Sequence, residues 1–241
     1  MPNLKRSHDR KVTNMATPNG KRSAIANTFG LPSGKQYSCP GATSVCEKIC
    51  YAGKLEKMYP SVREVLLHNW NALRNADRYD MAAMLDTMIT AFKYECEEKG
   101  VEKLFRIHWD GDFFSDDYTQ AWYLVITQHP DVHFWVYTRN DHAAVTLDGI
   151  PNLSLYFSVD SENKHKVEGL AMTCRTVKFA YLADTFADAK SAMLDMTGKP
   201  GASCPEQLKR IPLISEKGGA CAVCRLCVDG KSDIRFSISK R

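Results

Sequence analysis

The chain has 241 residues, of which 44% are hydrophobic and 25% are charged, and its formal net charge is +4. Such a composition is ordinary for a globular protein, and a chain of this length can bury a full core without disulfide bonds. No apolar run approaches the roughly 20 residues that cross a bilayer, and no apolar segment follows the basic N-terminus, so we expect neither a membrane span nor a secretory signal. The expected location is a reducing cytoplasm, where clustered cysteines are more often metal ligands or catalytic groups than disulfides.

The first 22 residues are polar and lack periodicity, and we interpret residues 1–22 as a flexible basic arm. The arm contains one carboxylate, Asp9, and six cationic residues, which are Lys5, Arg6, Arg10, Lys11, Lys21 and Arg22. An arm of this kind can contact nucleic-acid phosphates, although a solvated tail has the same composition. We expect residues 23–241 to form a single α/β domain that ends in a cysteine-rich segment, residues 200–241.

Along the domain, a strand is expected over residues 24–31, followed by a cysteine-bearing loop and by helices over residues 61–75 and 79–98. Gly100 is expected to stop the second helix. Strands and helices then alternate. The expected strands cover residues 104–109, 133–138, 153–159, 175–182 and 211–214, and the expected helices cover residues 116–128, 142–147, 161–170 and 186–196. Alternation of this kind predicts an α/β fold with parallel strands, here a partial, TIM-like (β/α) barrel of about six strands with cysteine-rich loops.

Seven of the nine cysteines fall into two sets, and the later set has the spacing of a ferredoxin. Cys221, Cys224 and Cys227 are separated by two residues each, and the remote Cys204 is followed by a proline. Four thiolates complete the iron sites of a cubane, so this set predicts a closed iron–sulfur cluster. Structural zinc is the alternative, although zinc sites favour two cysteine pairs and Cys204 has no nearby partner in sequence.

The earlier set offers three thiolates, those of Cys39, Cys46 and Cys50. Three ligands leave one iron of a [4Fe-4S] cluster open to a substrate or cofactor, and open coordination is typical of reactive metal sites. Alternatively, a fourth protein ligand completes the set; the candidates are His68, Asp112 and another cysteine. A third possibility joins both sets around one centre. The remaining cysteines, Cys96 and Cys174, are interpreted as ordinary buried thiols.

Polar residues follow three predicted strands in succession, at the ends that carry the active groups of parallel α/β barrels. The candidate catalytic residues are Asp110, Asp112, Arg139 and Asp160, and the candidate cofactor-binding residues are Gly111, Tyr137 and Ser158. Gly111 permits close approach of the backbone to a ligand, and Arg139 can hold a carboxylate or a phosphate through two hydrogen bonds. For Asp112 the alternative is a helix cap.

Several motifs occur together along the chain. They are Ser38-Cys-Pro-Gly-Ala, Cys50-Tyr-Ala, Asn69, Arg106-Ile-His-Trp-Asp-Gly-Asp, Trp122, Phe134-Trp-Val-Tyr-Thr-Arg and the terminal Cys-x-x-Cys-x-x-Cys. This combination resembles the bacteriophage gene-product-88 family over roughly residues 25–230. The Cys-Tyr-Ala and Ser158-Val-Asp-Ser-Glu-Asn segments are also similar to a phage family that resembles radical S-adenosylmethionine (SAM) proteins. The usual triplet of those proteins has three and then two intervening residues, whereas the intervals here are six and three.

The resemblances and the cysteine sets lead to two hypotheses about function. In the first, the chain is a phage iron–sulfur protein with one or two [4Fe-4S] clusters, and the open cluster binds SAM and acts on a small-molecule substrate. In the second, a metal, either iron–sulfur or zinc, only stabilises the fold, and the protein binds nucleic acid through the basic arm without catalysing a reaction.

Overall fold

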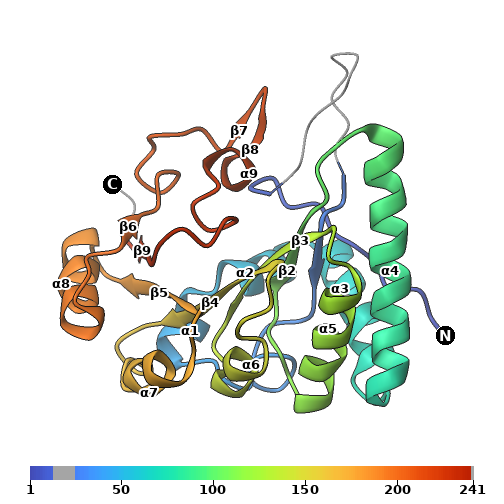
Figure 1. The fold of residues 1–241 in the computed structure, drawn as a ribbon, viewed down its shortest axis with the longest axis horizontal. Coiled ribbons are helices and arrows are strands. Elements are labelled where there is room, and N and C mark those ends of the chain that lie inside the picture. Colours follow the sequence, from blue (N-terminus) through green and yellow to red (C-terminus); the bar gives the residue numbers. More distant parts are fainter. Residues whose placement is uncertain (13–24, 240–241) are drawn as a thin grey trace.

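A computed structural model of the chain describes residues 1–12 and 25–239, and its centre is a parallel sheet (Figure 1). The seven strands of this sheet are, in spatial order, β1 (Thr28–Gly30), β2 (Leu104–Asp110), β3 (His133–Thr138), β4 (Leu153–Val159), β5 (Lys178–Ala183), β9 (Ile234–Ser237) and β6 (Ala202–Ser203). Every neighbouring pair is parallel. A separate antiparallel hairpin joins β7 (Ile214–Ser215) to β8 (Gly218–Gly219).

The helices of the described residues are α1 (Ser44–Ile49), α2 (Tyr51–Met58), α3 (Pro60–Leu73), α4 (Arg78–Lys99), α5 (Asp116–Gln128), α6 (Asp141–Thr146), α7 (Lys166–Thr173), α8 (Phe186–Thr197) and α9 (Ala220–Cys224). The long α4 illustrates why they begin and end where they do. Its N-terminus is capped by the Asp77 carboxylate, which accepts two backbone N–H groups, and it ends at Gly100, which has a φ of 60°. No helix in residues 1–12 and 25–239 is long and apolar enough to cross a membrane.

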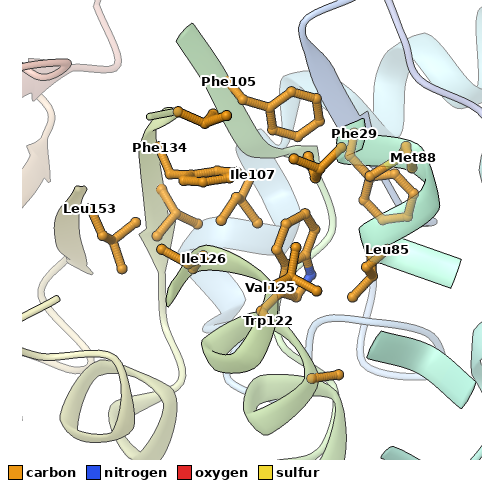
Figure 2. Packing of buried hydrophobic residues seen from close by; sticks show 14 of the residues in the cluster. Phe29, Leu85, Met88, Phe105, Ile107, Trp122, Val125, Ile126, Phe134 and Leu153 are labelled. Atoms are coloured by element: carbon orange, nitrogen blue, oxygen red, sulfur yellow. The ribbon is translucent and has the colours of Figure 1, made fainter. Parts of the chain in front are cut away.

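The two faces of the sheet pack against different parts of the chain, because side chains alternate along each strand. On β3, Phe134 and Val136 belong to the main core, which α4 and α5 cover. Figure 2 shows Phe105, Ile107 and Phe134 of the sheet against Trp122 of α5. The intervening β3 residue Trp135 points to the other face and packs against Val12 and Val228.

The chain segments that carry the cysteines cover this second face. In Figure 1 the C-terminal segment with β7, β8 and α9 lies on one side of the sheet, whereas α5, α6 and α7 lie on the other. Tyr156 of β4 packs there with Cys204 and Cys227, and Ala52 of α2 packs with Trp109 of β2. The second face therefore holds the cysteine sets against the strands.

The predicted α/β class and the parallel strands are confirmed, with differences at the end of the sheet. The strands follow chain order from β1 to β5, as in a barrel, but the described strands leave the sheet open, with β1 and β6 at its edges. The strand predicted over residues 211–214 is wrong, because Ile214 belongs to the hairpin. The strand that extends the sheet beyond β5 is β9, which follows the second cysteine set.

The prediction of cysteine-rich loops is not confirmed, because short helices carry several of the cysteines. Cys46 lies in α1, and Cys50 stands between α1 and α2. The Thr43 hydroxyl caps α1 by accepting the N–H of Cys46, and the Cys50 thiol caps α2 by accepting the N–H of Gly53 at 3.3 Å. A polar side chain thus caps the N-terminus of each of these two helices, in a segment that we expected to be a loop.

The predicted flexible arm differs from the structure over residues 1–12, which pack against the domain. The Ser7 N–H donates to the Thr28 carbonyl of β1 at 2.7 Å, and Val12 is fully buried. Two of the predicted cations form ion pairs, Arg6 with Glu95 and Lys11 with Glu206, each at 2.8 Å. The arm residues Lys21 and Arg22, like Ala24 of the first predicted strand, lie outside the described residues.

Candidate functional site

One cavity of about 210 Å³ brings the first cysteine set together with the strand ends. Its lining includes Cys39, Cys46 and Cys50 and six of the seven polar or glycine residues predicted at strand ends, namely Asp110, Gly111, Asp112, Tyr137, Arg139 and Ser158. The seventh, Asp160, does not line the cavity but contacts Arg139. Because the carboxyl ends of parallel strands meet at one edge of a sheet, residues far apart in sequence converge here.

Asp160 is linked to Cys46 through Thr43 and also holds Arg139. Its Oδ2 atom accepts hydrogen bonds from Arg139 Nη1 and from the Thr43 hydroxyl, each at 2.6 Å, and Asp160 is fully buried. Thr43 in turn accepts the N–H of Cys46 at 3.0 Å. Thr43 was missed by the sequence reasoning; its signal is a hydroxyl residue three positions before a cysteine, the spacing of an N-cap.

Asp112 joins the ends of β2 and β3. Its carboxylate accepts the Thr138 hydroxyl at 2.6 Å, the Arg139 N–H at 2.7 Å and the Phe113 N–H at 2.8 Å. Burial raises the pKa of Asp112 to about 6, although these three hydrogen bonds act in the opposite direction. The geometry indicates a positioning role for Asp112, which ties the Arg139 backbone to the neighbouring strand.

Asp110 differs from Asp112 because one of its oxygens has no partner. Asp110 is 4% exposed, its Oδ1 accepts the Gly111 N–H at 2.9 Å, and its buried Oδ2 makes no hydrogen bond within the described residues. Burial, followed by the nearby carboxylate of Glu56, raises the pKa of Asp110 to about 9. Sequence reasoning missed Glu56, which lies on α2 and accepts the Ser33 N–H at 2.9 Å.

Asp110 is one of three consecutive residues with an unsatisfied polar atom. Within the described residues, His108 Nδ1 and Trp109 Nε1 are also buried without a hydrogen-bond partner. All three residues line the cavity. Such atoms are rare in native interiors, and a bound ligand is one of the explanations for them. Trp109 Nε1 stands against Gly30, where an added Cβ would lie 2.5 Å from it, so the cavity itself is bordered by the three residues rather than by these buried atoms.

Burial raises the pKa of all three thiols of the first set, Cys39, Cys46 and Cys50. For Cys46 the Arg139 guanidinium opposes this effect. A coordinating metal deprotonates a thiol outright, so its charge reverses the effect of burial. The same three cysteines also line an outer cavity of about 310 Å³, and they therefore lie between the strand ends and the surface.

The second cysteine set surrounds a separate cavity of about 20 Å³. Its lining contains all four predicted ligands, Cys204, Cys221, Cys224 and Cys227. Burial raises the pKa of Cys221 and of Cys227 to about 12. The Cys221 N–H donates to the Lys11 carbonyl at 2.7 Å, so the N-terminal segment holds this set in place.

The two cysteine sets remain separate, and in the described part of the chain no group of three or more His, Cys, Asp or Glu side chains is arranged to hold a metal ion. Of the alternative fourth ligands, Asp112 lines the cavity of the first set. His68 does not, and its Nε2 lies 2.8 Å from the Asn3 carbonyl. Cys96 is buried in α4, as expected, whereas Cys174 is half-buried.

Arg106 and Tyr137 lie between the two sets. The Arg106 guanidinium stands 5.7 Å from the centre of the Tyr137 ring, and both residues line the first cavity. Tyr137 also packs against the cluster of Tyr156, Ala180 and Ile234, which Cys204 and Cys227 of the second set contact as well. The sequence reasoning missed Arg106, whose signal is an arginine inside the apolar strand Leu104–Asp110.

Comparisons with known proteins agree with the motifs that the cavity collects. The chain is 48% identical to the Gene 88 protein of Mycobacterium phage L5 and 47% identical to the Gene 88 protein of Mycobacterium phage D29, in each case over the whole of both chains. No solved structure matches it. A family model described as Gene product 88 matches residues 2–230, so the chain belongs to the Gene product 88 family of phage proteins.

Proposed function

We propose that this chain is a phage iron–sulfur protein whose first cysteine set holds a reactive [4Fe-4S] cluster. The observation that carries the proposal is the cavity that Cys39, Cys46 and Cys50 share with the polar ends of β2, β3 and β4. Three thiolates leave one iron without a protein ligand, and a substrate or cofactor in this cavity can then reach it. Burial of the cysteines beside polar side chains is the environment that such a site needs.

A second cluster at Cys204, Cys221, Cys224 and Cys227 is part of the proposal. The four thiols line one cavity, in agreement with a closed, four-thiolate site. Structural zinc is the alternative, but zinc sites favour two cysteine pairs, and Cys204 has no nearby partner in sequence.

As an enzyme, the protein would bind SAM in the first cavity. A reduced cluster with bound SAM supplies one-electron cleavage chemistry. The chain itself binds and orients. The Arg139 guanidinium is fixed by Asp160, and its remaining N–H groups suit a ligand carboxylate. Asp110 and Ser158, which line the same cavity, would contact other polar groups of the ligand.

Metal analysis of protein purified without oxygen tests the metal proposal. Two cubanes give about eight iron atoms and about eight sulfides per chain. The Cys46→Ala variant should lose about half of the iron, whereas the control Cys174→Ala should keep all of it, because Cys174 lines neither cysteine cavity. Stoichiometric zinc without iron would overturn the proposal. Unchanged iron in Cys46→Ala would show that the first set is not a ligand set.

Addition of SAM to the iron-loaded protein tests the enzyme proposal separately. We expect SAM to change the electronic spectrum of the first cluster and, after reduction, to be cleaved. The Arg139→Lys variant should keep its iron but bind SAM more weakly, because lysine keeps the charge and loses the two-pronged hydrogen bonding. An unchanged spectrum together with intact SAM would contradict the enzyme proposal while leaving the metal result standing.

A further inference from the structure

Helix α2 (Tyr51–Met58) presents two different sides to two neighbouring hollows. Lys54 and Lys57 are three residues apart and line the outer cavity of the first cysteine set. Tyr51, Leu55 and Tyr59, spaced four residues apart, line a second hollow of about 670 Å³ on the other side. One helix thus separates a cationic hollow from an aromatic one.

The cationic hollow carries more positive than negative charge. Its lining includes four cations, Lys48, Lys54, Lys57 and Arg63, and two carboxylates, Glu47 and Glu56. All four cations are exposed, and none of them forms an ion pair within residues 1–12 and 25–239. Glu56 is engaged by the backbone and hydroxyl of Ser33. The hollow is therefore suited to a ligand with several negative charges.

The aromatic hollow offers flat rings at the surface beside further cations. Tyr59 is 49% exposed and Tyr51 is 52% exposed, so both rings are accessible to a ligand in this hollow. The Tyr51 hydroxyl donates to the Trp109 carbonyl at 3.0 Å, and this hydrogen bond fixes the orientation of its ring. The exposed Arg10 and the half-buried Lys11 line the same hollow.

We propose that this α2 face, formed by Lys48, Lys54, Lys57, Arg63, Tyr51 and Tyr59, binds single-stranded nucleic acid. Backbone phosphates would contact the lysine side of α2, and unstacked bases would stack on the two tyrosines. Free cations together with exposed rings distinguish this ligand from an acidic protein, which offers charge but few flat π faces. A duplex keeps its bases stacked inside and cannot place them on the tyrosines.

The proposal assigns nucleic-acid contact to a surface other than the N-terminal arm, whose Arg6 and Lys11 are already paired. It also stands without any cluster, because none of the six residues is a cysteine. Helix α2 has eight residues, which corresponds to a length of about 12 Å, so the face contacts only a few nucleotides. A bound strand would pass across the opening of the first cysteine set, since Cys50 is the N-cap of the same helix.

Binding of a fluorescent single-stranded oligonucleotide of about 12 nucleotides to the full chain tests the lysine side; single-strand sites span about 4–16 nucleotides. The double variant Lys54→Gln, Lys57→Gln should bind more weakly and lower the slope of log K against log salt by about 1.4, because two phosphate contacts are lost. The matched control is Lys190→Gln, Lys199→Gln, which removes the same charge from exposed positions in and just after α8. Equal effects in the two double variants would overturn the proposal.

Tyr59 variants test the aromatic side. Tyr59→Ala should weaken binding by about 5- to 150-fold through loss of one stacked base, and Tyr59→Phe should retain binding because the ring remains. Equal weakening by both substitutions would contradict stacking. Competition then separates the ligand classes. Displacement of the oligonucleotide by equal charge concentrations of poly-glutamate, duplex DNA or anionic lipid vesicles would show that the face recognises charge alone and would overturn the single-strand assignment.

Discussion

Arg139 and Asp160 form a buried ion pair that joins the ends of β3 and β4 beside the first cysteine set. Arg139 Nη1 lies 2.6 Å from Asp160 Oδ2, and the two side chains are 10% and 1% exposed. The same carboxylate oxygen accepts the Thr43 hydroxyl, which caps the helix that carries Cys46. One oxygen atom therefore connects two strand ends to the cysteine segment.

Removal of the Asp160 carboxylate should strongly destabilise the folded protein. We expect Asp160→Asn to lower the free energy of unfolding by about 3–5 kcal/mol, because it leaves the Arg139 charge buried without a counter-charge. Urea unfolding followed by circular dichroism measures the change. The control is Lys166→Gln, which breaks the half-exposed pair of Lys166 with Asp141 and should cost less than about 1 kcal/mol. Similar losses in the two variants would contradict the importance of burial.

The convergence of Asp110, Asp112 and Arg139 was predictable because it depends only on parallel strands in chain order. Strand periodicity gives the positions of β2, β3 and β4, and topology places their ends together. The pairing of Arg139 with Asp160 was not predictable, because both residues were expected to face a ligand. The partner of a buried charge depends on the exact positions of the side chains around it. The periodicity of the sequence contains no information about these positions.

Gly111 should tolerate no side chain, for two separable reasons. Its φ of 86° strains any other residue, and an added Cβ would lie 2.5 Å from Ser38 Oγ and 2.8 Å from Leu31 Cβ. Gly149 has a similar φ of 80° with nothing within 4 Å of an added Cβ, so Gly149→Ala measures the strain alone, about 1–2 kcal/mol. Gly111→Ala should lower the free energy of unfolding, measured in urea, by clearly more than Gly149→Ala does. Equal losses would show that Gly111 serves only its backbone conformation.

His108 should make the protein less stable in acid. Burial, assisted by the positive charge of Arg106, lowers its pKa from 6.5 to about 3. Below pH 6.5 the unfolded chain takes up a proton that the folded chain does not, so the free energy of unfolding falls as pH decreases from about 6.5 to about 3. A shift of this size corresponds to roughly 4 kcal/mol over the full window.

Comparison with His108→Asn isolates this effect, because asparagine does not titrate and accepts the φ of 57° at this position. The Asp110 carboxyl, whose pKa is raised, contributes with the opposite sign in both proteins and therefore cancels in the difference. We expect the stability difference between the wild type and the variant to change in favour of His108→Asn between pH 7 and pH 4. A constant difference across that range would mean that His108 takes up a proton in the folded protein as readily as in the unfolded chain.

Sequence reasoning failed at the N-terminus for a reason that the contacts explain. A run of cations without periodicity predicts a solvated arm, because local patterns contain no information about distant partners. Lys11 pairs with Glu206, which is 195 residues away, and an added Cβ at Gly219 would lie 2.3 Å from the Arg10 carbonyl. The first strand is shorter than predicted: β1 covers Thr28–Gly30, where it pairs with β2 on one side while Thr28 bridges to Ser7 on the other.

If residues 1–12 are structural, a core substitution there should destabilise the whole domain. Val12 is fully buried against Trp135 and Val228, and its carbonyl accepts Asn27 Nδ2 at 2.6 Å. Val12→Ala removes about two buried methylene equivalents and leaves a small cavity, so we expect a loss of about 2 kcal/mol in urea unfolding. The same substitution at Val145, which is 45% exposed, should change the free energy of unfolding by less than about 0.5 kcal/mol. Equal, small effects at both positions would restore the interpretation of a detached arm. The expected contrast would mean that residues 1–12 are part of the folded domain. Truncation of the N-terminus should then also loosen Cys221, because the Cys221 N–H donates to the neighbouring Lys11 carbonyl.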